Sequence, residues 1–194
     1  MHGGDHSFVA GPRRHGPAFG RDRPPLQGRL GATVGNGLDN RYVIFRIGAE
    51  EYGLPVTAVN SIIRYEQATP VPRAPQGVLG VINLRGRVIP VVDLRLRFSA
   101  TPFAPTPGSR IVVAEGAAGP VGLAVDSASE VAELPAEEVR PVPEGVLSIE
   151  TQRAFTGVVE RDGSLVILVD LDQAVPRSEY AGALTSDDEG SDDV

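Results

Sequence analysis

The sequence has no cysteine and no lysine, and its three histidines all lie within the first fifteen residues. The lack of cysteine excludes disulfides, thiolate metal sites and cysteine nucleophiles. Because no histidine follows His15, the rest of the chain has no histidine to act as a general base or a metal ligand. All eighteen cationic side chains are arginine, which we attribute to coding bias and not to chemistry.

Long apolar runs and aromatic residues are also scarce. No segment approaches the roughly 18 apolar residues of a membrane-spanning helix, and no apolar stretch typical of a secretory signal follows the N-terminus. Aromatic residues make up 5% of the chain, too few for a platform that stacks single-stranded nucleic acid. These absences predict no direct membrane insertion and no nucleic-acid partner.

Composition divides the chain into three parts. Residues 1–40 are rich in Gly, Pro and Arg and predict a disordered leader of charge +2, and residues 181–194 predict an acidic disordered tail of charge −5. Residues 41–180 carry thirteen arginines and seventeen acids, and their net −4 argues against a duplex nucleic-acid surface. About 140 residues can bury roughly two thirds of their surface, as one compact domain or as two small subdomains.

The strongest structural signal is Gly80–Phe98, which reads GVINLRGRVIPVVDLRLRF. β-Branched residues on both sides of Arg85-Gly86 predict two strands joined by a tight turn. Further short strands follow at spacings of about 8–12 residues, and helical periodicity is almost absent. The pattern predicts an all-β fold, a set of barrels or a sandwich, with short helical turns near Val56 and after Asp172.

The chain contains an internal repeat. A shift of 77 residues places Gly80–Leu94 on Gly157–Leu171 without a gap and with six identities, and a shift of 69 places 52–56 on 121–125. Strands resemble one another by chance, but we favour two similar five-stranded units, about 41–98 and 109–175. A unit of about 60 residues is marginal alone, so the two should pack through a shared apolar seam with a groove between them.

The two hairpin tips differ in chemistry. The second, Glu160–Gly163, is an ordinary polar Asp-Gly turn, whereas the first carries Leu84 and Arg85. The excess chemistry at the first tip suggests a contact with a partner. The alternative is that Arg85 is a solvated turn cation and Leu84 a core residue at the strand end, and these residues alone leave both interpretations open.

Candidate catalytic groups are few. The serines of residues 41–180 lack a histidine or lysine partner, and the glycines near Gly80 lack the lysine and following helix of a phosphate loop. Asp93 and Asp170 are related by the repeat and could form an acid pair, but we favour a role in ending each strand by binding backbone amides. We therefore predict no enzyme activity, no cofactor and no metal.

Three motifs resemble the CheW-like adaptors of bacterial chemotaxis: EEYGLPV (50–56), VNSIIRYEQATPVPRAP (59–75) and GVINLRGRVIPVVDLRLRF (80–98). The resemblance spans about residues 40–176. It implies two packed five-stranded SH3-like barrels. It also implies a non-catalytic cytoplasmic scaffold that joins the cytoplasmic tips of methyl-accepting chemoreceptors to the regulatory domain of a CheA-type histidine kinase, so that partners hold it at membrane receptor arrays.

The resemblance also implies where partners bind. The arginine of the NLRG turn, here Arg85, couples to receptors in the family, and Val59 lies in a region that meets partners. The family usually has glutamate where this chain has Ser61. The predicted partner-binding residues are Val59, Ser61, Asn83, Leu84, Arg85 and Gly86. The alternatives are a CheW-like scaffold for surface motility or development, a small-barrel nucleic-acid module, and an enzyme using Asp93.

Overall fold

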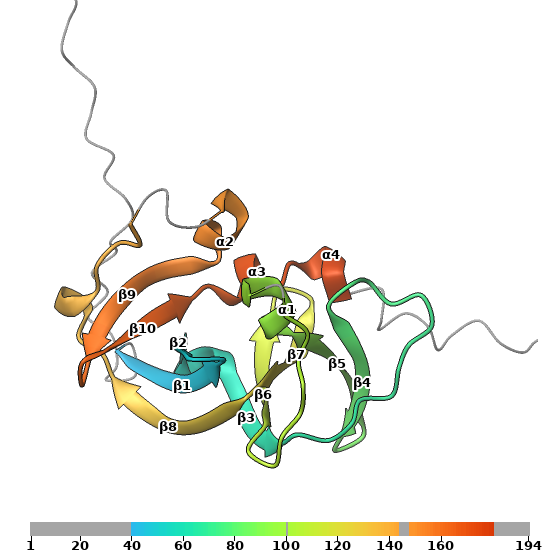
Figure 1. Cartoon of the computed structure of the whole chain (residues 1–194). Coiled ribbons are helices and arrows are strands. Elements are labelled where there is room, and N and C mark those ends of the chain that lie inside the picture. The colour runs from blue at the N-terminus through green and yellow to red at the C-terminus, as the bar shows by residue number, and fades with distance from the viewer. Residues whose placement is uncertain (1–39, 100, 144–147, 181–194) are drawn as a thin grey trace, which may run out of the picture. The chain divides into compact units, whose positions relative to one another are not determined.

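The structure is a computed structural model that describes residues 40–99, 101–143 and 148–180 (Figure 1). The predicted leader, apart from Asn40, and the predicted acidic tail lie outside these residues. The strands are β1 (Arg41–Ile47), β2 (Glu50–Pro55), β3 (Val59–Arg64), β4 (Val78–Leu84), β5 (Arg87–Asp93), β6 (Arg110–Gly116), β7 (Gly119–Val125), β8 (Ser127–Glu133), β9 (Phe155–Arg161) and β10 (Ser164–Val169). The helical turns are η1 (Val56–Ala58), α1 (Leu94–Ser99), η2 (Ala136–Glu138), α2 (Ile149–Arg153), α3 (Leu171–Ala174) and α4 (Arg177–Tyr180).

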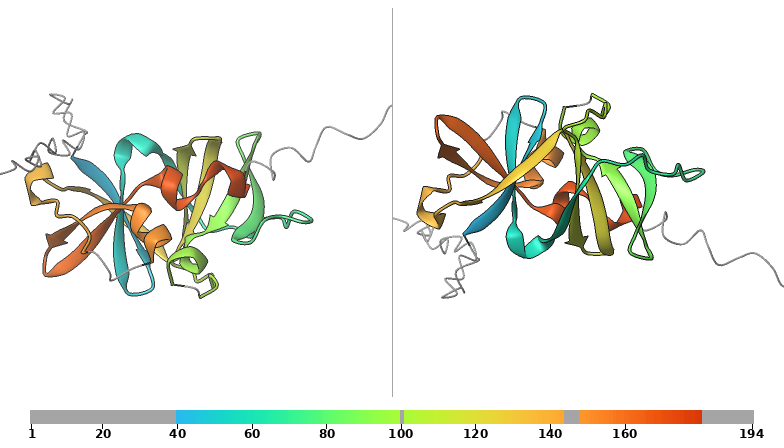
Figure 2. Two further views of the ribbon diagram at one scale, coloured as in Figure 1. Left: turned by 90° about the horizontal axis from the view of Figure 1, so that it is seen from above. Right: turned by 90° about the horizontal axis from the view of Figure 1, so that it is seen from below.

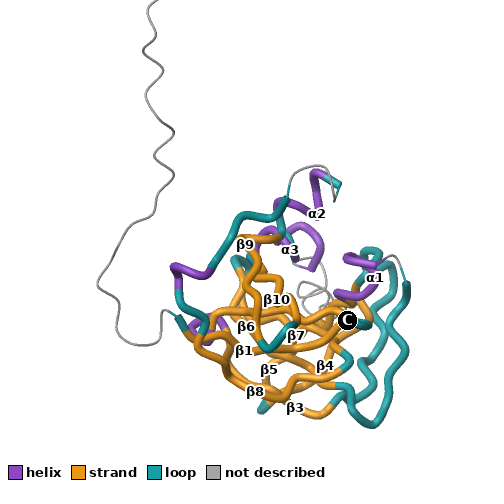
Figure 3. The backbone as a smooth tube through the Cα atoms, turned by 60° about the vertical axis from the view of Figure 1, so that its left-hand side comes forward, coloured by secondary structure: helices purple, strands orange, loops and turns teal. Residues whose placement is uncertain are grey.

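The strands form two five-stranded sheets, which confirms the predicted all-β class. The β1 barrel has the order β8-β1-β2-β10-β9, and the β3 barrel has the order β3-β6-β7-β5-β4. The two barrels lie side by side when the molecule is seen from above or below (Figure 2). Helices α1, α2 and α3 lie on one side of them (Figure 3), where the Arg97 guanidinium donates to the Gln173 carbonyl over 3.3 Å.

Each barrel takes strands from both halves of the chain. The hairpin β1–β2 belongs to the sheet of β8, β9 and β10, and the hairpin β6–β7 belongs to the sheet of β3, β4 and β5. The barrels therefore do not coincide with the predicted units 41–98 and 109–175. The reason lies in two parallel pairings, β2 with β10 and β5 with β7, which join strands that are distant in the sequence.

The internal repeat is visible in how the strands pair, even though the two halves exchange hairpins. Positions related by 69 residues pair alike. Phe45 pairs with Ala128, and Ala114, which is 69 residues after Phe45, pairs with Val59. The register shifts next to this pair in both ladders. Positions related by 77 residues also pair alike in the β4–β5 and β9–β10 hairpins. We call two positions equivalent when they are related in this way.

A crossing segment closes each barrel. Thr69 exchanges two backbone hydrogen bonds of 2.8 Å with Val81, and Arg140 exchanges bonds of 2.9 and 2.8 Å with the equivalent Val158. The crossing backbone passes directly over Gly80 and Gly157. A Cβ on Gly157 would lie 2.6 Å from the Val139 side chain and 2.9 Å from the Arg140 carbonyl oxygen. These glycines are identical in the repeat because only hydrogen fits beneath the crossing segment.

Three apolar clusters hold the molecule together. The largest lies between the sheets and joins Phe45, Tyr52 and Leu54 of one barrel to Leu123 and Val125 of the other, which confirms the predicted shared seam. Each barrel has a smaller interior cluster of its own. Among the described residues, no helix is long and apolar enough for a bilayer crossing.

A polar clamp holds the point where the chain crosses from β7 to β8. The Asp126 carboxylate accepts from Arg95 of α1 over 2.7 Å and from the backbone N–H of Gly48, in the β1–β2 turn, over 2.6 Å. The Asp126 N–H donates to the Arg46 carbonyl. One side chain thus connects the β7–β8 crossing to the β1–β2 turn and to helix α1.

Crowding at Gly80 gives a stability prediction. Gly80 has φ +143°, and its Cβ would lie 2.6 Å from the Thr69 carbonyl carbon. We expect Gly80→Ala to lower the free energy of unfolding by about 3 kcal/mol or more in urea denaturation, because backbone must move. Gly163→Ala is the control, since Gly163 has φ +78° but open space around its Cβ position. It should cost only about 1–2 kcal/mol, and equal losses would contradict the barrel-closure explanation.

Tyr52 predicts an alkaline dependence. The residue is 5% exposed, and its ring stacks on Phe98 with centroids 5.2 Å apart. Burial, with a smaller contribution from Glu50, raises its pKa to about 12. An unfolded tyrosine loses its proton near pH 10, so the stability from Tyr52 is complete below pH 10 and falls as pH rises toward 12. Urea titrations across this range should show a shallower decline for Tyr52→Phe, and identical declines would refute the assignment.

Candidate functional site

The β4–β5 tip has the backbone of a type I′ turn. Arg85 has φ +53° and Gly86 φ +83°, the left-handed pair that this turn requires. The Asn83 side-chain oxygen accepts from the Gly86 N–H over 2.9 Å and fixes the turn. Asn83, Arg85 and Gly86 are exposed, and Leu84 is half-buried. The predicted tip residues are therefore contiguous, and three of the four face solvent.

Arginine is a costly choice at this turn. The equivalent residue of the second hairpin is Asp162, with φ +51°, and aspartate adopts this conformation more readily. The left-handed region costs a residue with a Cβ about 1–2 kcal/mol. Strain alone does not mark function, since the exposed Arg73 also has φ +60°. Arg85 differs from Arg73 because the same chain makes the equivalent turn with Asp162, a residue type that adopts this conformation more readily.

Val59 and Ser61 lie on β3, an edge strand of the β3 barrel. Both are half-buried, and they pair with Ala114 and Val113 of β6. Val59 packs against the large cluster between the sheets, whereas Leu84 packs against the interior cluster of the β3 barrel. The two apolar side chains among the predicted partner-binding residues therefore belong to different clusters.

The other barrel shows how Ser61 relates to the tip. Its equivalent is Glu130, and the equivalent of Leu84 is Arg161. Glu130 accepts two hydrogen bonds from Arg161, of 2.7 and 3.3 Å, which tie the edge strand β8 to the second hairpin tip. Arg161 holds the pKa of Glu130 below its ordinary value. By this equivalence, Ser61 and Leu84 occupy the edge-to-tip position of the β3 barrel, with no ion pair between them.

Asp93 and Asp170 end their strands as predicted. The buried Asp93 carboxylate accepts from the N–H groups of Leu96 and Phe103 over 3.0 and 2.8 Å, which starts helix α1. Asp170 accepts from the N–H groups of Asp172 and Gln173 at the start of α3. Helix α1 was not predicted, because the run LRLRF has no strong helical period.

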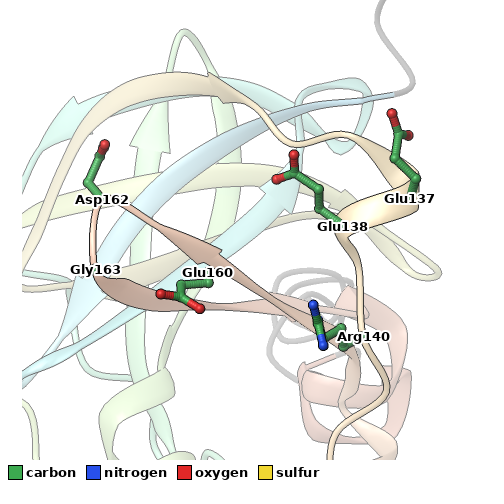
Figure 4. Close-up of a pocket in the computed structure, with 6 residues that line it drawn as sticks. All are labelled: Glu137, Glu138, Arg140, Glu160, Asp162 and Gly163. Carbon is green, nitrogen blue, oxygen red and sulfur yellow. The ribbon is translucent and has the colours of Figure 1, made fainter.

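Acidic residues border a surface pocket in the β1 barrel. Glu137, Glu138, Glu160, Asp162 and Gly163 line it with a single cation, Arg140, in a volume of about 360 Å³ (Figure 4). Within the described ranges, no group of three or more His, Asp or Glu side chains is placed to hold a metal ion. The pocket contributes negative charge to the surface near the second tip.

The link between the second hairpin and the edge strand β8 was not predicted from the sequence. Glu160–Gly163 was interpreted as an ordinary turn with no connection to β8. The available signal was the repeat itself. The shift of 69 relates β3 to β8, the shift of 77 relates the two tips, and together they place Glu130 and Asp162 where the β3 barrel has Ser61 and Arg85.

Sequence comparisons with known proteins identify a family that this chain matches. The family model described as CheW-like domain matches residues 41–179. The chain is 37% identical over 142 residues to the chemotaxis protein CheW of Rhizobium meliloti, covering 73% of this chain and 90% of that protein. It is 34% identical over 151 residues to the chemotaxis protein CheW of Klebsiella aerogenes, covering 78% and 88%.

The fold is also found in a solved structure. The crystal structure of the scaffolding protein TtCheW from Thermoanaerobacter tengcongensis matches with a TM-score of 0.65 at 27% identity, covering 74% of this chain and 92% of that chain. The likeness confirms the predicted pair of SH3-like barrels.

The strained tip gives a matched pair of substitutions. Asparagine tolerates the left-handed region better than arginine does. We expect Arg85→Asn and Arg73→Asn each to raise the free energy of unfolding by about 0.5–1 kcal/mol in urea denaturation. A loss of stability in Arg85→Asn would mean that the Arg85 side chain supports the fold.

Proposed function

The chain belongs to the CheW-like family, and from this membership we propose that it is a non-catalytic adaptor that couples chemoreceptors to a CheA-type histidine kinase. The proposed partners are the kinase regulatory domain and the cytoplasmic receptor tip. The adaptor would then sit at membrane receptor arrays through these partners. Its mechanism is mechanical, because it holds two proteins in a fixed relation and turns over no substrate.

One observation carries this proposal at the level of residues. Arg85 stands exposed in a strained turn that the second hairpin makes with aspartate. A long cation held at a rigid tip can reach a carboxylate or a carbonyl on a partner and form a charge-assisted hydrogen bond. The Asn83–Gly86 hydrogen bond fixes the turn in advance, so little further ordering is needed on binding.

The two proposed partner surfaces lie at the β4–β5 tip and along the edge strand β3. Leu84 and Arg85 are proposed to meet the receptor tip, toward the groove between the barrels. Val59 and Ser61 are proposed to meet the kinase regulatory domain along β3. An apolar anchor with a polar rim is the usual anatomy of such interfaces. Ser61 replaces a charge that the family usually carries, which would alter the choice of kinase partner.

A binding experiment tests the proposal with the same substitutions. The tagged full chain, Arg85→Asn and Arg73→Asn are each used to capture partners from lysate of cells that express the chemosensory proteins, with mass spectrometry as the readout. We expect the parent chain and Arg73→Asn to recover a CheA-type kinase and chemoreceptors. Arg85→Asn should lose the receptor by about tenfold or more while it stays folded, since a charged contact at an interface is worth about 1.5–3 kcal/mol.

Other outcomes are equally informative. Recovery of neither partner by the folded parent chain would refute the adaptor function. Equal receptor recovery by all three proteins would refute the role of Arg85 and leave the family assignment intact. Recovery of a kinase from a motility or developmental pathway would establish the alternative scaffold.

A further inference from the structure

The last described residues are held at one end of the β3 barrel, by the turn between β6 and β7. Tyr180 at the end of α4 is buried, and its hydroxyl oxygen accepts from the Ala118 N–H over 3.0 Å. The Asp172 carboxylate of α3 accepts from the neighbouring Ala117 N–H over 2.9 Å. The chain therefore passes out of the described structure beside this turn.

The β4–β5 tip lies at the same end of the barrel. β5 and β7 are parallel neighbours, and Val91 pairs with Gly122. Three residues earlier, the same register brings Val88 level with Gly119, the first residue of β7. Neighbouring strands are about 4.8 Å apart, so the β6–β7 turn lies beside the tip. Seen from above, α4 lies next to the strands of this barrel (Figure 2).

Charge distinguishes the tip from the rest of the domain. Residues 41–180 carry a net charge of −4, with thirteen arginines and seventeen acids, whereas the tip Asn83–Arg87 carries two arginines and no acid. Arg85 and Arg87 are both exposed. Neither makes an ion pair with any other residue that the structure describes. The tip is therefore a surface that can attract an acidic segment.

The sequence supplies such a segment directly after Tyr180. Residues 181–194 contain no cation and five acids, which are Asp187, Asp188, Glu189, Asp192 and Asp193. The first acid follows Tyr180 by seven residues, which span up to about 25 Å when extended. This reach is several times the spacing of about 4.8 Å between strands, so the acids can reach the tip.

We propose that the acidic segment 187–193 binds the β4–β5 tip of its own chain, with its carboxylates on the guanidinium groups of Arg85 and Arg87. Hydrogen bonds between these groups are charge-assisted. The short connection through residues 181–186 gives the segment an effective concentration in the millimolar range, so even a weak contact is populated. The segment is then a competitor, within the chain, of any acidic partner that binds the tip.

This inference goes beyond the proposed function, because it assigns the tip an occupant within the chain itself. Its regulatory consequence rests on the proposed function, since a receptor would have to displace the segment from Arg85. The contact itself needs no partner, so it is tested on the protein alone.

Amide NMR spectra of the full chain test the contact. In the triple variant Asp187→Asn/Asp188→Asn/Glu189→Gln, the segment loses three charges and keeps its length. We expect the Gly86 N–H signal to shift between the parent chain and the triple variant at about 0.05 M salt, and this difference to vanish at about 0.5 M salt. The Gly163 N–H in the second tip is the internal control and should not shift.

A spin label tests which arginines hold the segment. Because the sequence has no cysteine, Ser191→Cys supplies a single thiol for a nitroxide label that broadens nearby amide signals. We expect the label to broaden the Gly86 N–H signal, and the added change Arg85→Gln/Arg87→Gln to weaken this broadening. Arg64→Gln is the matched control and should leave it unchanged, because the exposed Arg64 ends β3 opposite the start of β6, at the other end of the barrel.

Three results would overturn the proposal. An unchanged Gly86 signal in the triple variant would mean that the segment does not bind the tip. Equal shifts at Gly86 and Gly163 would mean a general effect of charge. A Gly86 shift that grows with protein concentration would mean that the segment binds a second copy and not its own chain.

Receptor capture then separates this proposal from the proposed function. The triple variant should recover about twofold more receptor than the parent chain, because a segment that covers the tip half of the time halves the binding-competent fraction. Equal recovery would refute the competition. Recovery of no receptor by either protein would refute the adaptor function, and the NMR result would still decide whether the segment binds the tip.

Discussion

The exchange of hairpins between the two halves of the chain is the constraint on which the rest of the structure depends. Each barrel is completed by two strands from the other half, through the parallel pairings of β2 with β10 and β5 with β7. Neither half can close a barrel alone, so the two barrels and their shared core should form together. Asp126 stands where β7 passes to β8, and its bonds to Arg95 and Gly48 hold that crossing in place.

Because one backbone plan is used twice, the chain separates what the fold requires from what the surface adds. The identities Gly80/Gly157 and Asp93/Asp170 have structural causes, the closing segments and the strand-end caps. Arg95, two residues after Asp93 in the motif VDLR, also has a structural role, because it binds Asp126. The exposed equivalents diverge, with Arg85 in one tip and Asp162 in the other, so this surface position can change at the small cost in stability that arginine has in a left-handed turn.

Local sequence determined the hairpins, their turns and the repeat, because strand pattern and Asp-Gly or Arg-Gly turns act over a few residues. It could not determine the exchange of hairpins, since β1–β2 has the same pattern whichever β-sheet it joins. Helix α1 was missed because its start depends on the buried Asp93 carboxylate and not on helical periodicity. Val59 was grouped with Leu84, yet tertiary packing assigns the two to different clusters.

The two hairpin tips carry opposite charges at equivalent positions, Arg85 in one and Asp162 in the other, and this has a physical consequence for the proposed adaptor. Two tips of like charge would attract the same kind of partner, whereas a basic tip and an acidic tip each repel what the other attracts. Repulsion contributes to specificity as much as attraction does. Ser61 strengthens this difference. A glutamate there would place a carboxylate near the tip, in the position from which Glu130 of the other barrel binds Arg161. With serine at position 61 and Leu84 at the tip, Arg85 has no acidic neighbour among the equivalent positions, which is compatible with the proposed contact between Arg85 and a partner.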